Sequence, residues 1–175
     1  MVEKLKGVEA LENVFTEVFK SFGIDKVELG TEFAYWYINE SITFKLDYNR
    51  VDKWFDEFVQ TRFHLPNYDW FVFSFLHEIG HHKTIDTIST GLQTRIDRKK
   101  DRYEKIMNFK FIKWYICPTF IKKRLENKYF QLYDEMKASR WAVKYYRTHT
   151  KEIAKISKKL TFALHQFYKI NNVTE

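Results

Sequence analysis

Cysteine, proline and glycine are scarce in this chain, which has one, two and five of them in 175 residues. A single cysteine cannot form an internal disulfide, which excludes a disulfide-stapled scaffold and suits a reducing compartment. Cys117 stands in an apolar run, so we expect a buried structural thiol and not a nucleophile. The few prolines and glycines disfavour a β-sandwich with many tight turns and favour long helices.

Long hydrophobic runs are also missing. The most apolar window, residues 109–121, is 13 residues long and contains two lysines and a proline, whereas a helix needs about 20 apolar residues to cross a bilayer. The first residues alternate in charge and lack the apolar stretch of a signal peptide. We therefore expect a cytoplasmic protein with no membrane partner. We interpret the window as a hydrophobic insertion folded onto the domain, with a lid or a partner surface as the alternative.

Aromatic and apolar residues are plentiful, at 19% and 45% of the sequence, which is enough for a buried core. The length fits a single domain over 1–175. Apolar residues spaced three and four apart predict helices over 5–22, 51–63, a stretch starting near Asp69, 128–147 and 151–170. Alternation within 27–46 predicts a small antiparallel β-hairpin. This order predicts a mainly helical α+β domain.

The motif His77-Glu78-x-x-His81 is the part of the sequence that indicates chemistry. Residues four apart on a helix project from the same face, so the two imidazoles lie about 6 Å apart and can share one Zn²⁺. Glu78 points beside the metal, where it can accept a proton from the zinc-bound water and pass it to the leaving amine. By composition, such a motif is expected about 0.02 times in a chain like this, so composition alone does not account for it.

The residues before the motif indicate where it lies. Six of the seven residues from Trp70 to Leu76 are apolar, so they cover every side of the helix and place it in the core. A carboxylate and two imidazoles at the end of a buried helix need partners, because unpaired burial of such groups costs several kcal/mol. A metal ion is such a partner.

A catalytic zinc needs a third protein ligand and an open position for water. The residues after His81 lack the glycine and the histidine of a metzincin motif, which excludes that class. The best candidate is Glu135, which shares a helical face with Ala138 and Ala142, two small residues that let helices approach closely. Asp134 projects about 100° away, as a solvated or capping acid would. The alternatives that stay open as third ligand are Asp134, His149 and His165.

Two segments together resemble a known family. Residues 75–82 and 134–143 are similar to the two signature helices of the ImmA/IrrE-like zinc metallopeptidases and related phage-encoded peptidases. The resemblance implies a zincin-like fold of the gluzincin type and an enzyme that hydrolyses protein or peptide substrates with one catalytic Zn²⁺. Carried over by position, it implies His77, His81 and Glu135 as metal ligands and Glu78 as general base.

The chain departs from the family pattern in two respects. Lys137 and Ser139 stand where the family usually has an acid and then Asp or Asn, so the carboxylate that would orient a ligand histidine is not at its usual place. Residues 91–127 form an insertion that lengthens the distance between the two motifs. In folds of this type a strand edge aligns an extended substrate, and the 27–46 hairpin is positioned to do so or simply to cover the core.

The net charge of +7 is divided unevenly along the chain. Residues 1–90 hold 9 basic and 15 acidic side chains, whereas residues 91–175 hold 21 and 8. The basic half could bind nucleic acid or a DNA-bound protein, or could consist of solvated helix faces. The sequence therefore predicts a zinc metallopeptidase. The alternative is a weakly active or inactive module of metallopeptidase fold that binds DNA or an acidic protein through this half.

Overall fold

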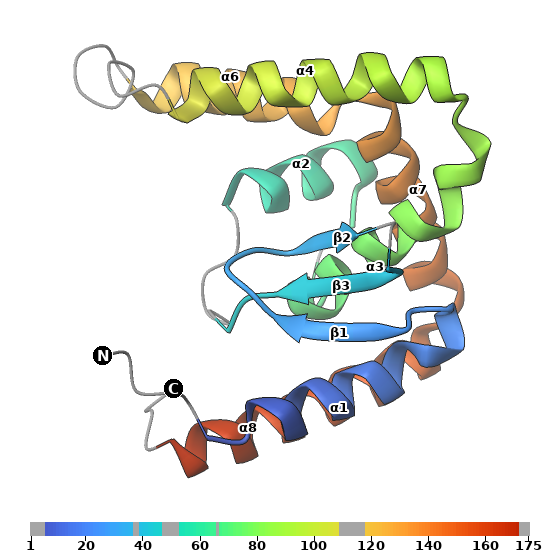
Figure 1. The fold of residues 1–175 in the computed structure, drawn as a ribbon, viewed down its shortest axis with the longest axis vertical. Helices are drawn as coiled ribbons and strands as arrows, with labels where there is room; N and C mark the ends of the chain where they lie inside the picture. The colour runs from blue at the N-terminus through green and yellow to red at the C-terminus, as the bar shows by residue number, and fades with distance from the viewer. Residues whose placement is uncertain (1–5, 37–38, 47–52, 66, 109–117, 172–175) are drawn as a thin grey trace.

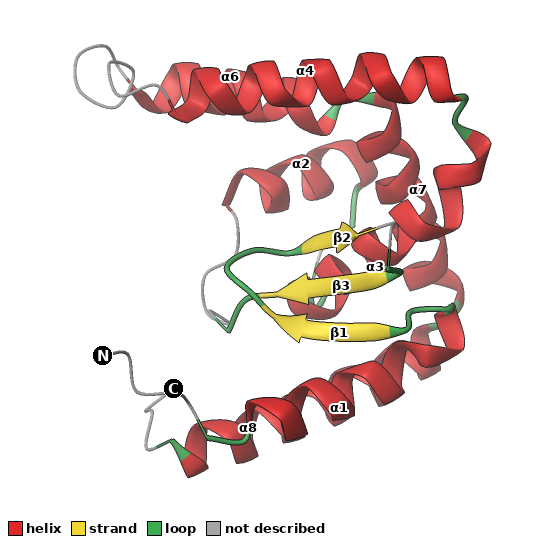
Figure 2. Ribbon diagram, viewed as in Figure 1, coloured by secondary structure: helices red, strands yellow, loops and turns green. Residues whose placement is uncertain are grey.

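Helices make up most of the fold, and one small sheet lies among them (Figures 1 and 2). The computed structural model describes residues 6–36, 39–46, 53–65, 67–108 and 118–171. The helices are α1 (Val8–Phe19), α2 (Lys53–Phe63), α3 (Trp70–Thr84), α4 (Thr90–Asn108), α6 (Pro118–Phe130), α7 (Tyr133–Thr148) and α8 (Thr150–Ile170). The strands are β1 (Lys26–Leu29), β2 (Ala34–Trp36) and β3 (Ser41–Phe44). The prediction of a mainly helical α+β fold is confirmed.

The sheet corrects one prediction, because it is mixed and not purely antiparallel. β2 and β3 form the expected antiparallel hairpin, but β1 runs parallel to β3 on its other side, which gives the strand order β1-β3-β2. Burial explains this arrangement. Val27 of β1 pairs with Ile42 of β3 and both are fully buried, whereas Trp36 of β2 is 51% exposed. The two strands with fully buried side chains therefore pair with each other, and β2 takes an edge.

α1 closes the outer edge of β1. The Val27 amide donates to Thr16 Oγ1 at 2.9 Å, and the Leu29 amide donates to Glu12 Oε1 at 2.7 Å. Side chains of the helix thus take the place of a further strand. The 3-10 turn Lys20–Phe22 extends α1 to Gly23, whose φ of 85° suits a residue without a side chain. α8 lies beside α1, on the same side of the sheet (Figure 1).

α3 is the buried centre of the fold. It begins after Asp69, as predicted, because the Asp69 side chain accepts hydrogen bonds from two backbone amides of the first turn at 3.1 and 3.2 Å. All residues from Phe71 to Gly80 are buried. Phe75 stacks on Phe19 of α1 with ring centroids 4.6 Å apart. The aromatic core therefore fixes the first turns of α3, and its later turns carry the polar motif to the border of that core.

α7 packs against α3 at very short range. A side-chain carbon at Gly80 would lie 2.5 Å from the carbonyl oxygen of Ala138, so glycine alone fits there without a shift of the backbone. Ala138 and Ala142 are both fully buried, as their size and spacing predicted. This contact holds the first turns of α7, which carry Glu135, against the second half of α3.

The helix predicted over 128–147 is in fact two helices. α6 ends at Phe130 and α7 begins at Tyr133, and Leu132 between them is extended, with φ −59° and ψ 150°. Apolar residues continue through the junction, so their spacing does not reveal the break. The break places Asp134 and Glu135 in the first turn of α7, where the positive end of the helix dipole stabilises carboxylates.

The segment predicted as an insertion, residues 91–127, contains most of α4 and α6. These two helices lie side by side at the end of the molecule opposite α1 and α8, and α6 packs on α2 (Figure 1). Residues 109–117 lie outside the described residues, so the prediction for Cys117 and most of the 109–121 window falls there. Among the residues that are described, no helix is both long and apolar enough to span a membrane.

Substituting Gly80 with alanine tests the contact between α3 and α7. The added carbon must displace the Ala138 carbonyl, so we expect Gly80→Ala to lower the free energy of unfolding by about 1–3 kcal/mol or more. Gly91→Ala is the matched control, because Gly91 is helical and nothing lies within 4 Å of the added carbon. It should be neutral or stabilise by up to about 1 kcal/mol. Urea unfolding followed by circular dichroism measures both, and equal stability of the two variants would contradict the close contact.

Candidate metal centre

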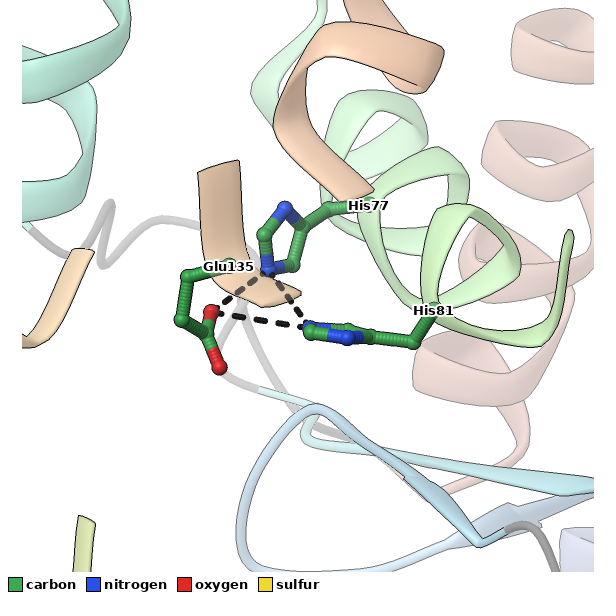
Figure 3. A group of neighbouring side chains, drawn as sticks. All are labelled: His77, His81 and Glu135. Atoms are coloured by element: carbon green, nitrogen blue, oxygen red, sulfur yellow. Dashed lines mark hydrogen bonds and ion pairs between the residues drawn. The ribbon is translucent and has the colours of Figure 1, made fainter. Parts of the chain in front are cut away.

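Three side chains that can bind a metal meet where α3 and α7 pack together (Figure 3). His77 and His81 project from one face of α3, and Glu135 faces them from the first turn of α7. Glu135 Oε2 lies 3.1 Å from His77 Nε2 and 3.5 Å from His81 Nε2. The two Nε2 atoms are 3.2 Å apart. The three residues predicted as ligands are therefore brought together, and each offers one ligand atom.

The spacing of these atoms fits a tetrahedral zinc ion. Bonds of about 2.0 to 2.1 Å at tetrahedral angles separate two ligand atoms by about 3.3 to 3.4 Å. The separations of 3.1, 3.2 and 3.5 Å lie on both sides of this value. Two imidazole nitrogens and one carboxylate oxygen are a donor set typical of catalytic zinc, which keeps a fourth position for water. Within the described ranges, no second group of three His, Cys, Asp or Glu side chains is close enough to hold a metal.

A hydroxyl on α7 orients His77. Ser139 Oγ lies 3.2 Å from His77 Nδ1, and both side chains are buried. When Nδ1 donates its proton to this oxygen, the Nε2 lone pair is free to bind a metal beside Glu135. Ser139 therefore occupies the place of the Asp or Asn that the family pattern led us to expect. Its position four residues after Glu135, on the same helical face, was the signal in the sequence.

Glu135 has a second partner, Lys100 of α4, which no pattern in the sequence predicted. The Lys100 ammonium forms ion pairs with Glu135 Oε1 and, at 2.6 Å, with Asp134 Oδ2. Asp134 is thus not a solvated acid, because it is 4% exposed and its charge pairs with this lysine, and it does not belong to the group of possible ligands. One feature of the sequence could have indicated this: Lys100 follows the buried Ile96 by about one helical turn, so it lies on the inward face of α4 although it stands in a run of basic residues.

The charges around the site keep Glu135 ionised. Burial alone would raise the pKa of Glu135, but the two histidines and Lys100 hold it well below its usual range. Burial alone would lower the pKa of His81, but Glu135, assisted by Glu78, raises it above its ordinary value. The site therefore presents a carboxylate that attracts a cation, and at acidic pH a proton competes with the metal for His81.

A cleft of about 520 Å³ lies over these residues. Glu78 lines it together with His77 and His81 and is 8% exposed, so its carboxylate shares the cleft with the candidate ligands. Residues 32–35, on and before β2, form another part of its lining, and so do side chains of α4 and α6. The edge strand of the sheet is therefore next to the candidate ligands.

In comparisons with known proteins, no protein family, no curated protein and no solved structure matches this chain. The assignment of the site therefore rests on the motif and on the geometry of the side chains.

Tyr35 adds a hydroxyl to the cleft that the sequence did not point to. It belongs to β2, and its hydroxyl lies 2.7 Å from Nδ1 of His82, the residue after the second candidate ligand. Burial, together with the nearby Glu40 and Asp86, raises the pKa of Tyr35 to about 12. Its hydroxyl therefore stays protonated at neutral pH and can donate a hydrogen bond.

The remaining candidates for a third ligand lie elsewhere. His149 stacks on Tyr145 at the end of α7, with ring centroids 4.0 Å apart, and His165 is exposed on α8. Neither belongs to the group of three side chains. Of the alternatives left open by the sequence, the geometry favours Glu135.

Zinc should stabilise the protein against heat. At a free zinc concentration 100 times Kd, binding adds about 2.7 kcal/mol, which raises Tm by about 5–10 °C in a domain of this size. We expect His77→Ala and Glu135→Ala to lose this shift and His149→Ala to keep it, as measured by differential scanning calorimetry. The shift should also shrink between about pH 8 and pH 5.5, because the raised pKa of His81 favours the proton over the metal. A shift of equal size in all variants would contradict the assigned site.

Proposed function

We propose that this protein is a zinc-dependent metallopeptidase of the ImmA/IrrE-like, gluzincin type with a zincin-like fold. The observation that carries the proposal is the triangle of His77, His81 and Glu135, whose spacing suits one zinc ion. Glu78 supports it, because this carboxylate follows the first ligand and lines the same cleft. A purely structural zinc site has no need of a base beside its ligands, so Glu78 favours hydrolysis.

The roles of the residues follow from their positions. A zinc ion held there would polarise the scissile carbonyl and lower the pKa of a bound water. His77 and His81 supply neutral donors and Glu135 a negative one, while Ser139 holds the His77 ring in orientation. Glu78 accepts a proton from the attacking water and delivers it to the amide nitrogen that leaves. When His82 Nδ1 carries a proton and donates it to the Tyr35 oxygen, the Tyr35 hydroxyl can donate its own proton to a substrate in the cleft.

The cleft favours an extended peptide or protein segment as substrate. Residues 32–35 line it, and β2 is an edge strand, so a peptide backbone can pair with β2 above α3. α1 already occupies the opposite edge at β1, which leaves β2 as the edge for such pairing. Pairing of this kind depends on the peptide backbone, so the substrate needs an extended conformation and no particular sequence motif.

Glu78→Gln separates metal binding from hydrolysis. Glutamine has the size of glutamate but cannot accept the proton, so the variant should keep its zinc and lose about 100- to 10,000-fold in hydrolysis rate. Zinc content is measured by atomic emission, and hydrolysis with a mixture of fluorescence-quenched peptides of random sequence. Glu9→Gln, an exposed position on α1, is the matched control and should behave as the wild type. Equal rates for Glu78→Gln and the wild type would exclude Glu78 as the base.

The outer face of α4 supports a second candidate function. It carries four exposed cations with no hydrogen-bond or ion-pair partner among the described residues: Arg95, Arg98, Lys99 and Arg102. Asp97 and Glu104 of the same helix line the cleft instead, together with Lys100, so this outer face carries positive charge without those two acids. We propose as the alternative that the protein binds DNA, or an acidic protein, through this face, with weak or no catalysis.

Removing part of this charge tests the alternative. The triple variant Arg95→Gln/Arg98→Gln/Arg102→Gln should weaken binding to mixed-sequence duplex DNA and reduce the slope of log affinity against log salt by about 3. Lys155→Gln/Lys158→Gln/Lys159→Gln removes the same charge from the exposed side of α8 and should have a smaller effect. Equal losses in both variants would show that net charge alone matters. Absence of DNA binding by the wild type at about 50 mM salt would eliminate DNA as the partner.

A further inference from the structure

One cation of α4 lies inside the protein while its neighbours face solvent. The Lys100 side chain is 21% exposed, whereas Arg98 and Lys99 beside it are exposed. Lys100 lines the cleft, and its ammonium lies 5.4 Å from the centre of the Tyr129 ring of α6. Ordering a lysine side chain costs about 1.5–2 kcal/mol of rotamer freedom. Specific partners must therefore hold it in place.

Lys100 and the histidines take different oxygens of Glu135. Oε2 faces the Nε2 atoms of His77 and His81 at 3.1 and 3.5 Å, and the Lys100 ammonium binds Oε1. Partners on both oxygens fix the rotation of the carboxylate about its last bond. Glu135 therefore faces the candidate metal site with Oε2, while Oε1 stays bound to Lys100 of α4.

Asp134 holds the ammonium from its other side. Its Oδ2 lies 2.6 Å from Lys100 Nζ, and the side chain is 4% exposed. Asp134 does not belong to the metal-binding triangle. Its carboxylate thus serves to keep Lys100 in reach of Glu135, and the shared ammonium offsets the repulsion between two adjacent buried carboxylates.

We propose that Lys100 is a positioning residue for the metal centre: it occupies Glu135 Oε1, so that Glu135 binds zinc through Oε2 alone and the fourth position stays open to water. The inference rests on the proposed metal centre but not on peptidase activity. A carboxylate without this restraint can bind with both oxygens, which adds a fifth ligand atom and crowds the position that a catalytic zinc keeps for water. α4 then contributes to the site although it supplies no ligand.

Cobalt substitution tests the number of ligand atoms directly, because the visible absorption of Co²⁺ is strong in four-coordinate sites and weak in sites with more ligands. The full chain is titrated with CoCl₂ as wild type, Lys100→Met, Lys100→Arg and the matched control Lys99→Met. We expect Lys100→Met to bind Co²⁺ with weaker absorption and, as the zinc form, to hydrolyse random peptides about 10- to 100-fold more slowly. Lys100→Arg, whose guanidinium can pair with both carboxylates, should restore the wild-type spectrum. Lys99→Met should match the wild type.

A double variant keeps the test decisive if Lys100→Met does not fold. Lys100→Met/Asp134→Asn removes one positive and one negative charge, so the net charge at the site equals that of the wild type, and it should show the same weak absorption. A wild-type cobalt spectrum in a folded Lys100→Met or double variant overturns the proposal. A wild type that binds cobalt and hydrolyses no peptide overturns the peptidase proposal alone, and a wild type that binds neither zinc nor cobalt overturns both.

Discussion

The contact between Gly80 and Ala138 sets the geometry on which the candidate site depends. At this point the backbone of α7 fills the space that a side chain on α3 would take. His77 lies three residues before Gly80, and Glu135 lies three residues before Ala138, so both are nearly one turn from the same contact. Contact between two backbones leaves less freedom than contact between side chains. It therefore holds the candidate ligands on separate helices at a repeatable distance, as a metal centre would require.

A chain of buried polar groups spreads from this contact across three helices. Ser139 and Glu135 of α7 bind His77 of α3, and Lys100 of α4 binds Glu135 and Asp134 in turn. Such a chain costs free energy if one member lacks a partner, because the interior offers no water to replace it. The aromatic packing around Phe75 in the first half of α3 offsets part of that cost. Packing of the apolar first half of α3 thus compensates for burial of the polar groups in its second half.

Local patterns predicted the parts of the site that lie within one helix. The spacing of His77 and His81, the cap at Asp69 and the small residues after Glu135 are properties of one or two helical turns, and they can be read from the sequence. The pairing of β1 with β3 and the partners of Lys100 join residues far apart in the chain. Periodicity carries no information on such partners, so neither the mixed sheet nor the partners of Lys100 could be predicted from the sequence.

The cover that α1 places over β1 also bears on how copies of the chain can associate. A sheet with two open edges can add copies at both and grow into a fibre, whereas β1 has its outer amides bound by Thr16 and Glu12. Among the strands that the structure describes, β2 is the one whose edge another strand can join. Two copies that met through β2 would use up the open edge of each, so association by strand addition ends at a closed pair and cannot propagate into a filament.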